Sequence, residues 1–294
     1  MIYSWTRRKY FSLLPLHLTC YFNSVERVGD SGLFSSCTRI KSGTRRFSPA
    51  PGSDQEYSDG MENKKYRMIR MIVFDMAGTT IDEDNVVYKT LQGSINDQGF
   101  DLTLDQILAE GAGREKLQAV KGILKAYAGN TDEKLSENIY VDFIGRLTKA
   151  YDKLEVLPQP GAIELFLNLR QRNVRIVLNT GYDSGTAESL IGKLGWQKGI
   201  EYDLLVSASD VLKNRPDPEM IELAMGKFGI ENPKEVVKVG DSVIDIEEGQ
   251  NAGCLYSIGI TSGAHSYTQL LSASPDFIIN HLLEMLPILD RAEG

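Results

Sequence analysis

Apolar residues are distributed along the chain in a pattern that predicts short buried strands between amphipathic helices. After residue 70, six apolar runs of three to six residues are separated by stretches in which apolar residues return every three or four positions. This alternation is typical of a parallel α/β sheet with helices on its faces. The expected strands are Met71–Asp75, Val174–Asn179, Leu204–Ser207, Val236–Val239, Tyr256–Ile260 and Phe277–Ile279.

The segment between the first two of these strands has a purely helical pattern. Helices are expected within residues 85–155, at NVVYKTLQGSIND, LDQILAEG, REKLQAVKGILKAYAG and ENIYVDFIGRLTKAYDKL. Such an insert suggests a cap domain that closes over a site and excludes water. The alternative is a helical subdomain that only packs against the core. We therefore expect a Rossmann-like parallel α/β core of residues 69–84 and 156–294, with an all-helical cap at 85–155.

Residues 1–68 lack this periodicity and are rich in Ser and Arg. Their longest apolar run, FSLLPLHLTCYF, is too short to span a bilayer. A transit peptide, a secretory signal and a translation start assigned too far upstream are the competing interpretations, and Met61, Met68 and Met71 are internal alternatives for the start. We favour a disordered tail or a mis-assigned start, and expect residues 1–60 to be dispensable.

Composition narrows the class of protein. The chain of 294 residues is 42% hydrophobic and carries a net charge of −8, which argues against a nucleic-acid partner. Its three cysteines form no CxxC motif, which fits a reducing compartment, and three histidines are too few to favour a His-based metal site. We expect a cytoplasmic protein that acts on a small molecule, with no membrane partner and with a homodimer left open.

Four polar motifs follow predicted strands. Each has an ordinary explanation, as a turn, a helix cap or a solvated side chain. Taken together, however, the four motifs indicate a binding site, because the carboxyl ends of parallel strands meet at one edge of a sheet, where ligands bind. The motifs are FDMAGTT at 74–80, VLNTGYD at 177–183, NRPDPEM at 214–220 and VKVGDSVIDIEEG at 237–249.

The side chains of these motifs suit phosphoryl transfer. The Thr180 hydroxyl and the nearby backbone N–H groups can hold phosphoryl oxygens, and the Arg215 guanidinium can neutralise their charge. Asp241 and Asp245 are oxygen ligands of the kind Mg²⁺ prefers. With Asp75 as a carboxylate nucleophile, the set matches a reaction through an aspartyl intermediate.

In these motifs the chain resembles the haloacid dehalogenase-like hydrolases, over about residues 69–290. The resemblance implies that Asp75 attacks phosphorus, and that Mg²⁺ is held by Asp75, Asp241, the Ala77 carbonyl and Asp245 as a ligand or near neighbour. It also implies substrate contacts from Gly78, Thr79, Gly181 and Tyr182. Most phosphatases of that superfamily carry a second Asp, the general acid, at the place of Ala77.

The missing acid and two further motifs narrow the resemblance. DMAGTT, TGYD and RP-x-P are similar to phosphonatase (phosphonoacetaldehyde hydrolase) and still more to the phosphonatase-like hydrolases. In phosphonatase a cap lysine condenses with the substrate aldehyde as a Schiff base. Gly113 and Lys116 match that cap motif, within GAGREKLQAVKGIL. An iminium takes up the electrons of a C–P bond, so an acid at position 77 is not needed. Arg114, the positive end of a helix that starts near Gly113, and burial on cap closure are expected to favour the neutral form of the lysine.

Three departures from the phosphonatase pattern leave the substrate open. The Cys ten residues after the nucleophile is Asn85, and the Met and His around the cap lysine are Ala112 and Ala119. A phosphatase for a small phosphate monoester such as phosphoglycolate is therefore an alternative. A non-catalytic binding module with the same fold is a second one.

Overall fold

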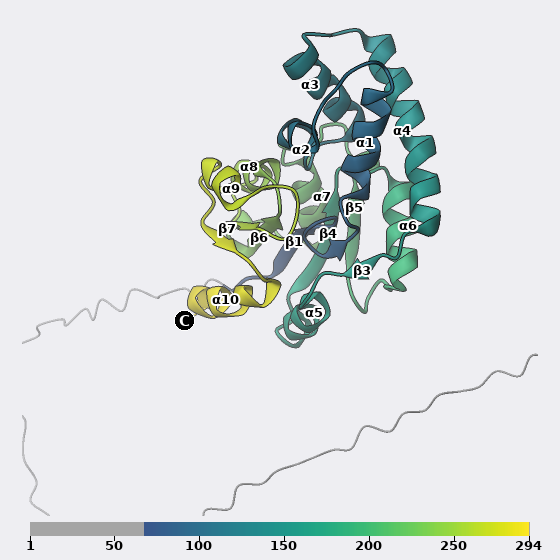
Figure 1. The fold of residues 1–294 in the computed structure, drawn as a ribbon. Coiled ribbons are helices and arrows are strands. Elements are labelled where there is room, and N and C mark those ends of the chain that lie inside the picture. Colours follow the sequence, from purple (N-terminus) through teal and green to yellow (C-terminus); the bar gives the residue numbers. More distant parts are fainter. Residues whose placement is uncertain (1–67, 294) are drawn as a thin grey trace, which may run out of the picture. The chain divides into compact units, whose positions relative to one another are not determined.

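The computed structural model describes residues 68–293, and the predicted tail lies outside them except for Met68. Six parallel strands form one sheet in the order β5-β4-β1-β6-β7-β8 (Figure 1). The first strand of the chain lies between β4 and β6, so three motif-bearing strands end side by side. The strands are β1 Met71–Asp75, β4 Arg175–Thr180, β5 Leu204–Ser207, β6 Val236–Gly240, β7 Tyr256–Ile260 and β8 Phe277–Ile279.

Four of the six predicted strands have the predicted bounds, one is shifted at both ends and one is longer at its carboxyl end. β4 begins one residue later than predicted and continues to Thr180, whereas β6 continues to Gly240. The reason is the backbone ladder, which runs beyond the apolar run: Thr180 pairs with Ser207 of β5 and Gly240 with Gly259 of β7.

Alternate residues of the central strand face opposite layers of helices, because side chains along a strand alternate between its two faces. Ile72 and Phe74 join one buried apolar cluster, and Met71 and Val73 join the other. Burial on both faces explains why these strands are continuous apolar runs. The described helices that follow the insertion are α5 Ala162–Gln171, α6 Ser184–Leu194, α7 Glu219–Phe228, α8 Val243–Asn251, α9 Tyr267–Ser272 and α10 Met285–Glu293, with short 3-10 turns η1 Ala208–Asp210, η2 Pro233–Glu235 and η3 Leu282–Glu284.

The insertion is helical, as the sequence predicts. Figure 1 shows its helices together at the top of the view, at the other end of the molecule from α5 and α10. Between residues 86 and 153 the structure has no strand. Inserted residues such as Ile123 and Phe143 join the apolar cluster that also holds Phe74 of β1. The division into cap and core at 85–155 stays a prediction. The inserted helices are α1 Val86–Asn96, α2 Leu104–Gly111, α3 Lys116–Ala128 and α4 Glu133–Lys153.

A small antiparallel pair at the base of the insertion was not predicted. β2 Ile81–Asp82 leaves the core and β3 Leu157–Pro158 returns to it, with Ile81 opposite Pro158. Two residues per strand are too few to show a period, so no sequence pattern could announce them. Among the helices of residues 68–293, none has the length and apolar character that a membrane span requires.

Candidate active site

Three buried carboxylates meet at the carboxyl ends of β1 and β6. Asp75 ends β1, Asp241 follows β6 and Asp245 lies in the first turn of α8. Each offers an oxygen within 4.8 Å of the others. Burial raises the pKa of Asp75 and of Asp241, and repulsion between the three carboxylates adds to it. Burial acts in the same direction on Asp245, but the charges of Arg215 and Lys238 outweigh it and lower its pKa.

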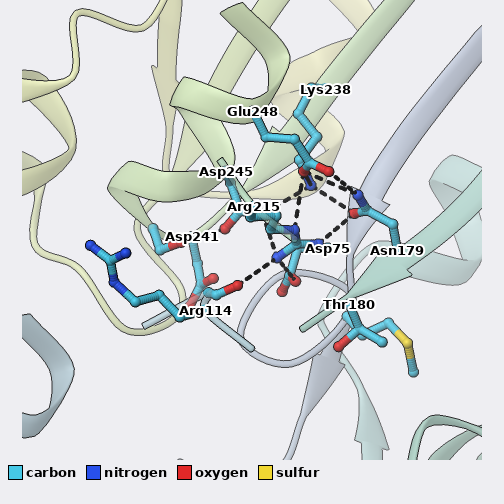
Figure 2. Close-up of polar contacts among 12 residues, drawn as sticks. Asp75, Arg114, Asn179, Thr180, Arg215, Lys238, Asp241, Asp245 and Glu248 are labelled. Carbon is cyan, nitrogen blue, oxygen red and sulfur yellow. Dashed lines mark hydrogen bonds and ion pairs between the residues drawn. The ribbon is translucent and has the colours of Figure 1, made fainter. Parts of the chain in front are cut away.

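Arg215 connects the predicted nucleophile to the rest of the site. Its Nη1 lies 2.7 Å from Oδ1 of Asp75 and 2.8 Å from Oδ1 of Asp245, and its guanidinium is fully buried. Its Nη2 donates to Oδ1 of Asn179 at 2.6 Å, and its Nε lies 3.1 Å from Glu248. Figure 2 shows these groups converging on the guanidinium. Arg215, which the sequence analysis singled out, thus lies beside the carboxylates.

Lys238 is a second buried cation that the motif analysis missed. Its Nζ lies 2.7 Å from Oδ1 of Asn179, 2.9 Å from Asp245 and 3.2 Å from Glu248. Asn179 in turn donates its side-chain amide to Glu248 at 2.9 Å. Charged residues are rarely buried unless they are paired. Polar residues inside otherwise apolar strands were thus an available signal for this network.

The predicted phosphate hydroxyl lies at the end of β4. Thr180 is buried, and its Oγ1 accepts the backbone N–H of Tyr182 at 3.2 Å. Gly181 faces the insertion so closely that an added Cβ would lie 2.5 Å from the carbonyl oxygen of Arg114. The hydroxyl of Thr79 is buried and has no hydrogen-bond partner among the residues described.

Gly78 gives the Asp241 carboxylate its space. It adopts φ +85, and a Cβ there would lie 2.3 Å from Oδ2 of Asp241. A Cβ on Gly263 would also overlap the Asp241 carboxylate, and the backbone N–H of Ala264 donates to Oδ2 of Asp241 at 2.6 Å. A cluster of three buried carboxylates, two of them with raised pKa values, beside a cradle lined by glycine fits a divalent cation such as Mg²⁺. Ala77, whose carbonyl is a predicted ligand, forms a backbone bridge with Ile81.

The cap lysine is buried at the start of α3. Lys116 Nζ donates to the Arg114 carbonyl at 3.0 Å and lies 5.1 and 5.0 Å from the ring centroids of Tyr88 and Tyr182. Burial, together with the charge of Arg215, lowers the pKa of Lys116 to about 8, although the charge of Asp75 opposes the shift. At pH 7 about a tenth of the amine is therefore neutral, far more than for a free lysine.

Two details of the expected lysine environment differ from the sequence prediction. The helix begins at Lys116 itself, whereas Gly113 lies in the preceding loop at φ +72. The guanidinium of Arg114 donates to the Glu110 carbonyl, and the cation that lowers the lysine's pKa is Arg215. The sequence around residue 114 could not show this effect, because Arg215 is far from Lys116 along the chain and comes near it only in the folded structure.

Gly113 holds the lysine loop against the core. A Cβ at this position would lie 2.3 Å from Ile244 and 2.4 Å from the hydroxyl of Ser242, both beside the predicted metal ligands. Its carbonyl accepts a long hydrogen bond of 3.5 Å from Arg215, and its N–H donates to the Tyr88 hydroxyl at 3.1 Å. The predicted glycine thus lets the cap loop and the core loop touch.

Comparisons with known proteins show the family to which the chain belongs. A model of the haloacid dehalogenase-like hydrolases matches residues 69–253. Phosphonoacetaldehyde hydrolase from Latilactobacillus sakei is 31% identical over 261 residues, with 76% of this chain and 96% of that protein covered. Phosphonoacetaldehyde hydrolase from Parabacteroides distasonis is 29% identical, with 68% and 78% covered. The chain belongs to the haloacid dehalogenase-like hydrolases, and it is a hydrolase rather than a non-catalytic binding module.

Solved structures show the same fold. A hydrolase from Pseudomonas syringae has a TM-score of 0.67 at 20% identity, covering 76% of this chain and all of that one. A phosphonoacetaldehyde hydrolase like protein from Oleispira antarctica has a TM-score of 0.66 at 20% identity, covering 76% and 92%. At these identities the structures support the α/β fold with its helical insertion.

Proposed function

We propose that the protein cleaves the C–P bond of a small phosphonate aldehyde such as phosphonoacetaldehyde. Asp75 is the nucleophile, Lys116 forms the Schiff base and Mg²⁺ is the cofactor. The observation that carries the proposal is a buried lysine, with its pKa lowered to about 8, in the electrostatic range of Asp75. Position 77 offers only a methyl group in the same site. Relatives that are phosphonoacetaldehyde hydrolases support the same chemistry.

The attack on phosphorus uses the free oxygen of the nucleophile. Arg215 holds Oδ1 of Asp75, and among the described residues no hydrogen-bond donor is paired with Oδ2. Oδ2 is therefore the attacking atom. The guanidinium and the Thr180 and Thr79 hydroxyls bind the phosphoryl oxygens. Asp75, Asp241, Asp245 and the Ala77 carbonyl would hold Mg²⁺, which would neutralise charge on the phosphoryl group.

Lys116 provides the electron sink. The neutral amine condenses with the aldehyde, and the iminium accepts the electron pair of the breaking C–P bond as an enamine. The leaving group departs without a proton from position 77, which is consistent with Ala77. Gly78, Gly113, Gly181 and Tyr182 shape the space between the two reacting groups.

A phosphatase acting on a phosphate monoester is the second candidate. The observations that favour it are Asn85, Ala112 and Ala119, which stand where phosphonatase carries Cys, Met and His. The carboxylates and Arg215 would serve such an ester equally well. An alkoxide leaving group gains from a proton donor, however, so Ala77 predicts weak hydrolysis of phosphoglycolate.

Borohydride trapping tests the proposal. The full chain is incubated with phosphonoacetaldehyde and borohydride, and the adduct is mapped by mass spectrometry. We expect added mass at Lys116, and we expect Lys116→Arg to abolish C–P cleavage because arginine keeps the charge but forms no iminium. Lys125→Arg, an exposed position on the same helix, is the matched control and should retain activity. Cleavage by Lys116→Arg, or turnover of phosphate esters alone, would replace this proposal with the phosphatase.

A further inference from the structure

Glu83 is a buried acid that the motif analysis did not assign. Glu83 directly follows β2, in the segment that leads from the strand of Asp75 into the insertion, and it is only 3% exposed. The next two residues, Asp84 and Asn85, adopt φ values of +52 and +53. L-residues rarely take this left-handed conformation, and it persists where the surrounding structure fixes it, often near functional sites. The loop thus carries Glu83 into the interior.

The carboxyl group of Glu83 has neutral partners. Its Oε2 accepts the Tyr151 hydroxyl at 3.2 Å and the Val87 N–H at 3.3 Å, and in the described chain it has no ion-pair partner. Burial raises the pKa of Glu83 to about 8, although these hydrogen bonds and the charge of Lys116 act in the other direction. The group is a carboxylic acid, carrying its proton, at neutral pH.

Glu83 also borders the reaction site. With Gly78 and Gly263, the two glycines that cradle Asp241, it lines a hollow of about 230 Å³. Glu83 also lies within electrostatic range of Lys116, since each of the two groups shifts the pKa of the other. The acid is therefore close to both the acidic metal cradle and the Schiff-base lysine.

The pair can exchange a proton where the surrounding phenols cannot. Glu83 and Lys116 both have a pKa of about 8. Burial raises the pKa values of Tyr88, Tyr151 and Tyr182 well above 10, so these phenols keep their protons near neutral pH. Several other ionisable groups act on the pair. Asp82 and Tyr151 act on Glu83, whereas Asp75, Arg215 and Glu115 act on Lys116. The phenols of Tyr88 and Tyr182 also interact with Glu83.

We propose that Glu83 donates and recovers the proton for the imine chemistry at Lys116. This inference rests on the proposed function and adds to it the acid that position 77 lacks. It also supplies a proton donor in a chain whose residues at 112 and 119 are alanine. Glu83 contributes to imine formation at the aldehyde end and takes no part in the attack on phosphorus.

Each proton that moves in this step has a donor and an acceptor. The neutral amine of Lys116 adds to the aldehyde carbon, and one of its protons passes to the carbonyl oxygen to give a carbinolamine. That hydroxyl leaves as water with the proton of Glu83, giving the iminium and a Glu83 carboxylate. After C–P cleavage and protonation of the enamine carbon by solvent, water hydrolyses the imine. The proton released there returns to Glu83.

The test is the rate of borohydride trapping at Lys116 over a pH series, in the wild-type chain and in Glu83→Gln. Glutamine keeps the size of the side chain and can still accept from Tyr151, but it cannot donate an acidic proton. We expect trapping and kcat for C–P cleavage to fall at least about tenfold, and the alkaline limb of the pH profile to disappear. Asp84→Asn neutralises an exposed acid of the same loop and suits the left-handed conformation, so it should trap at the wild-type rate.

Two contrary results are distinguishable. If the wild-type chain gives no adduct at Lys116, the proposed function fails and this inference falls with it. If the wild type is trapped and Glu83→Gln is trapped at the same rate with the same pH profile, only the role of Glu83 is overturned.

A second variant keeps the test decisive if Glu83→Gln does not fold. Tyr151→Phe removes a hydrogen bond that lowers the pKa of Glu83, so that pKa should rise. The alkaline limb of the profile should then move to higher pH while trapping at neutral pH is retained. A merely structural role of Glu83 would leave the limb in place, and an unmoved limb would therefore overturn the inference.

Discussion

Asp241 is the carboxylate with the most negative surroundings in the site. Burial and the charges of Asp75 and Asp245 raise the pKa of Asp241 well above the usual range. The buried cation Arg215 pairs with Asp75 and Asp245 instead. We expect Asp241→Asn to abolish metal dependence and to lower kcat by about 100-fold or more, as losses of electrostatic groups at reacting centres do.

The same substitution should act oppositely on stability. Removing one of three mutually repelling buried carboxylates should raise the thermal midpoint in EDTA, whereas Mg²⁺ should raise it in the wild type only. Thermal unfolding with and without Mg²⁺ measures both effects. Metal-dependent activity in Asp241→Asn would contradict the assignment of this residue as a ligand.

Single residues divide into those that sequence could place and those it could not. The positions of Asp75, Thr180 and Asp241 were predictable because each lies at the carboxyl end of a mostly apolar strand or directly after it, and parallel strands end at one edge. Glu83 was not, because nothing in the order of residues shows that a charged side chain after a two-residue strand turns inward. Its direction depends on the left-handed turn that follows and on Tyr151, 68 residues away.

At the scale of elements, the loop between α2 and α3 determines how the insertion meets the core. Gly113→Ala would place a Cβ 2.3 Å from Ile244 at a φ of +72. We expect a loss of about 1–3 kcal/mol in unfolding free energy and a much larger loss of activity, since Lys116 would be displaced from Asp75. Denaturant unfolding and kcat for C–P cleavage measure the two effects.

Gly122 provides the matched control for that prediction. It lies inside α3, and a Cβ there would meet nothing within 4 Å. Gly122→Ala should therefore stabilise the helix by about 0.5–1 kcal/mol and leave activity unchanged. Equal activities for the two alanine variants would show that the contact of the loop with α8 is not needed.

The elements themselves were largely predictable, for a physical reason. Strands buried on both faces must be continuous apolar runs, and helices on a sheet must repeat every 3.6 residues, so both kinds of element are visible in the order of residues. The start of α3 was the instructive exception. Helical periodicity extends back to residue 114, but the chain needs a cap there, and the Glu115 side chain accepts the N–H groups of Leu117 and Gln118.

At the scale of the whole molecule, the buried acid and the buried lysine make folding depend on pH. Burial raises the pKa of Glu83 from 4.5 to about 8 and lowers that of Lys116 from 10.5 to about 8. For Glu83, the unfolded chain ionises first, so stability is lost as pH rises from about 4.5 to about 8. For Lys116, the unfolded chain gains its proton first, so stability is lost as pH falls from about 10.5 to about 8.

Glu83→Gln isolates the first of these two contributions. The variant and the wild type should differ little in pH dependence below about 4.5, where Glu83 is protonated in both states. As pH rises to about 8, the free energy of unfolding of the variant should increase relative to the wild type, because glutamine has no proton to lose. Above that range the difference should stay constant. Urea unfolding across the pH series measures it, with Asp84→Asn as the control that should follow the wild-type slope. A difference that shrinks with rising pH would mean that the Glu83 carboxyl is ionised and stabilised in the folded protein.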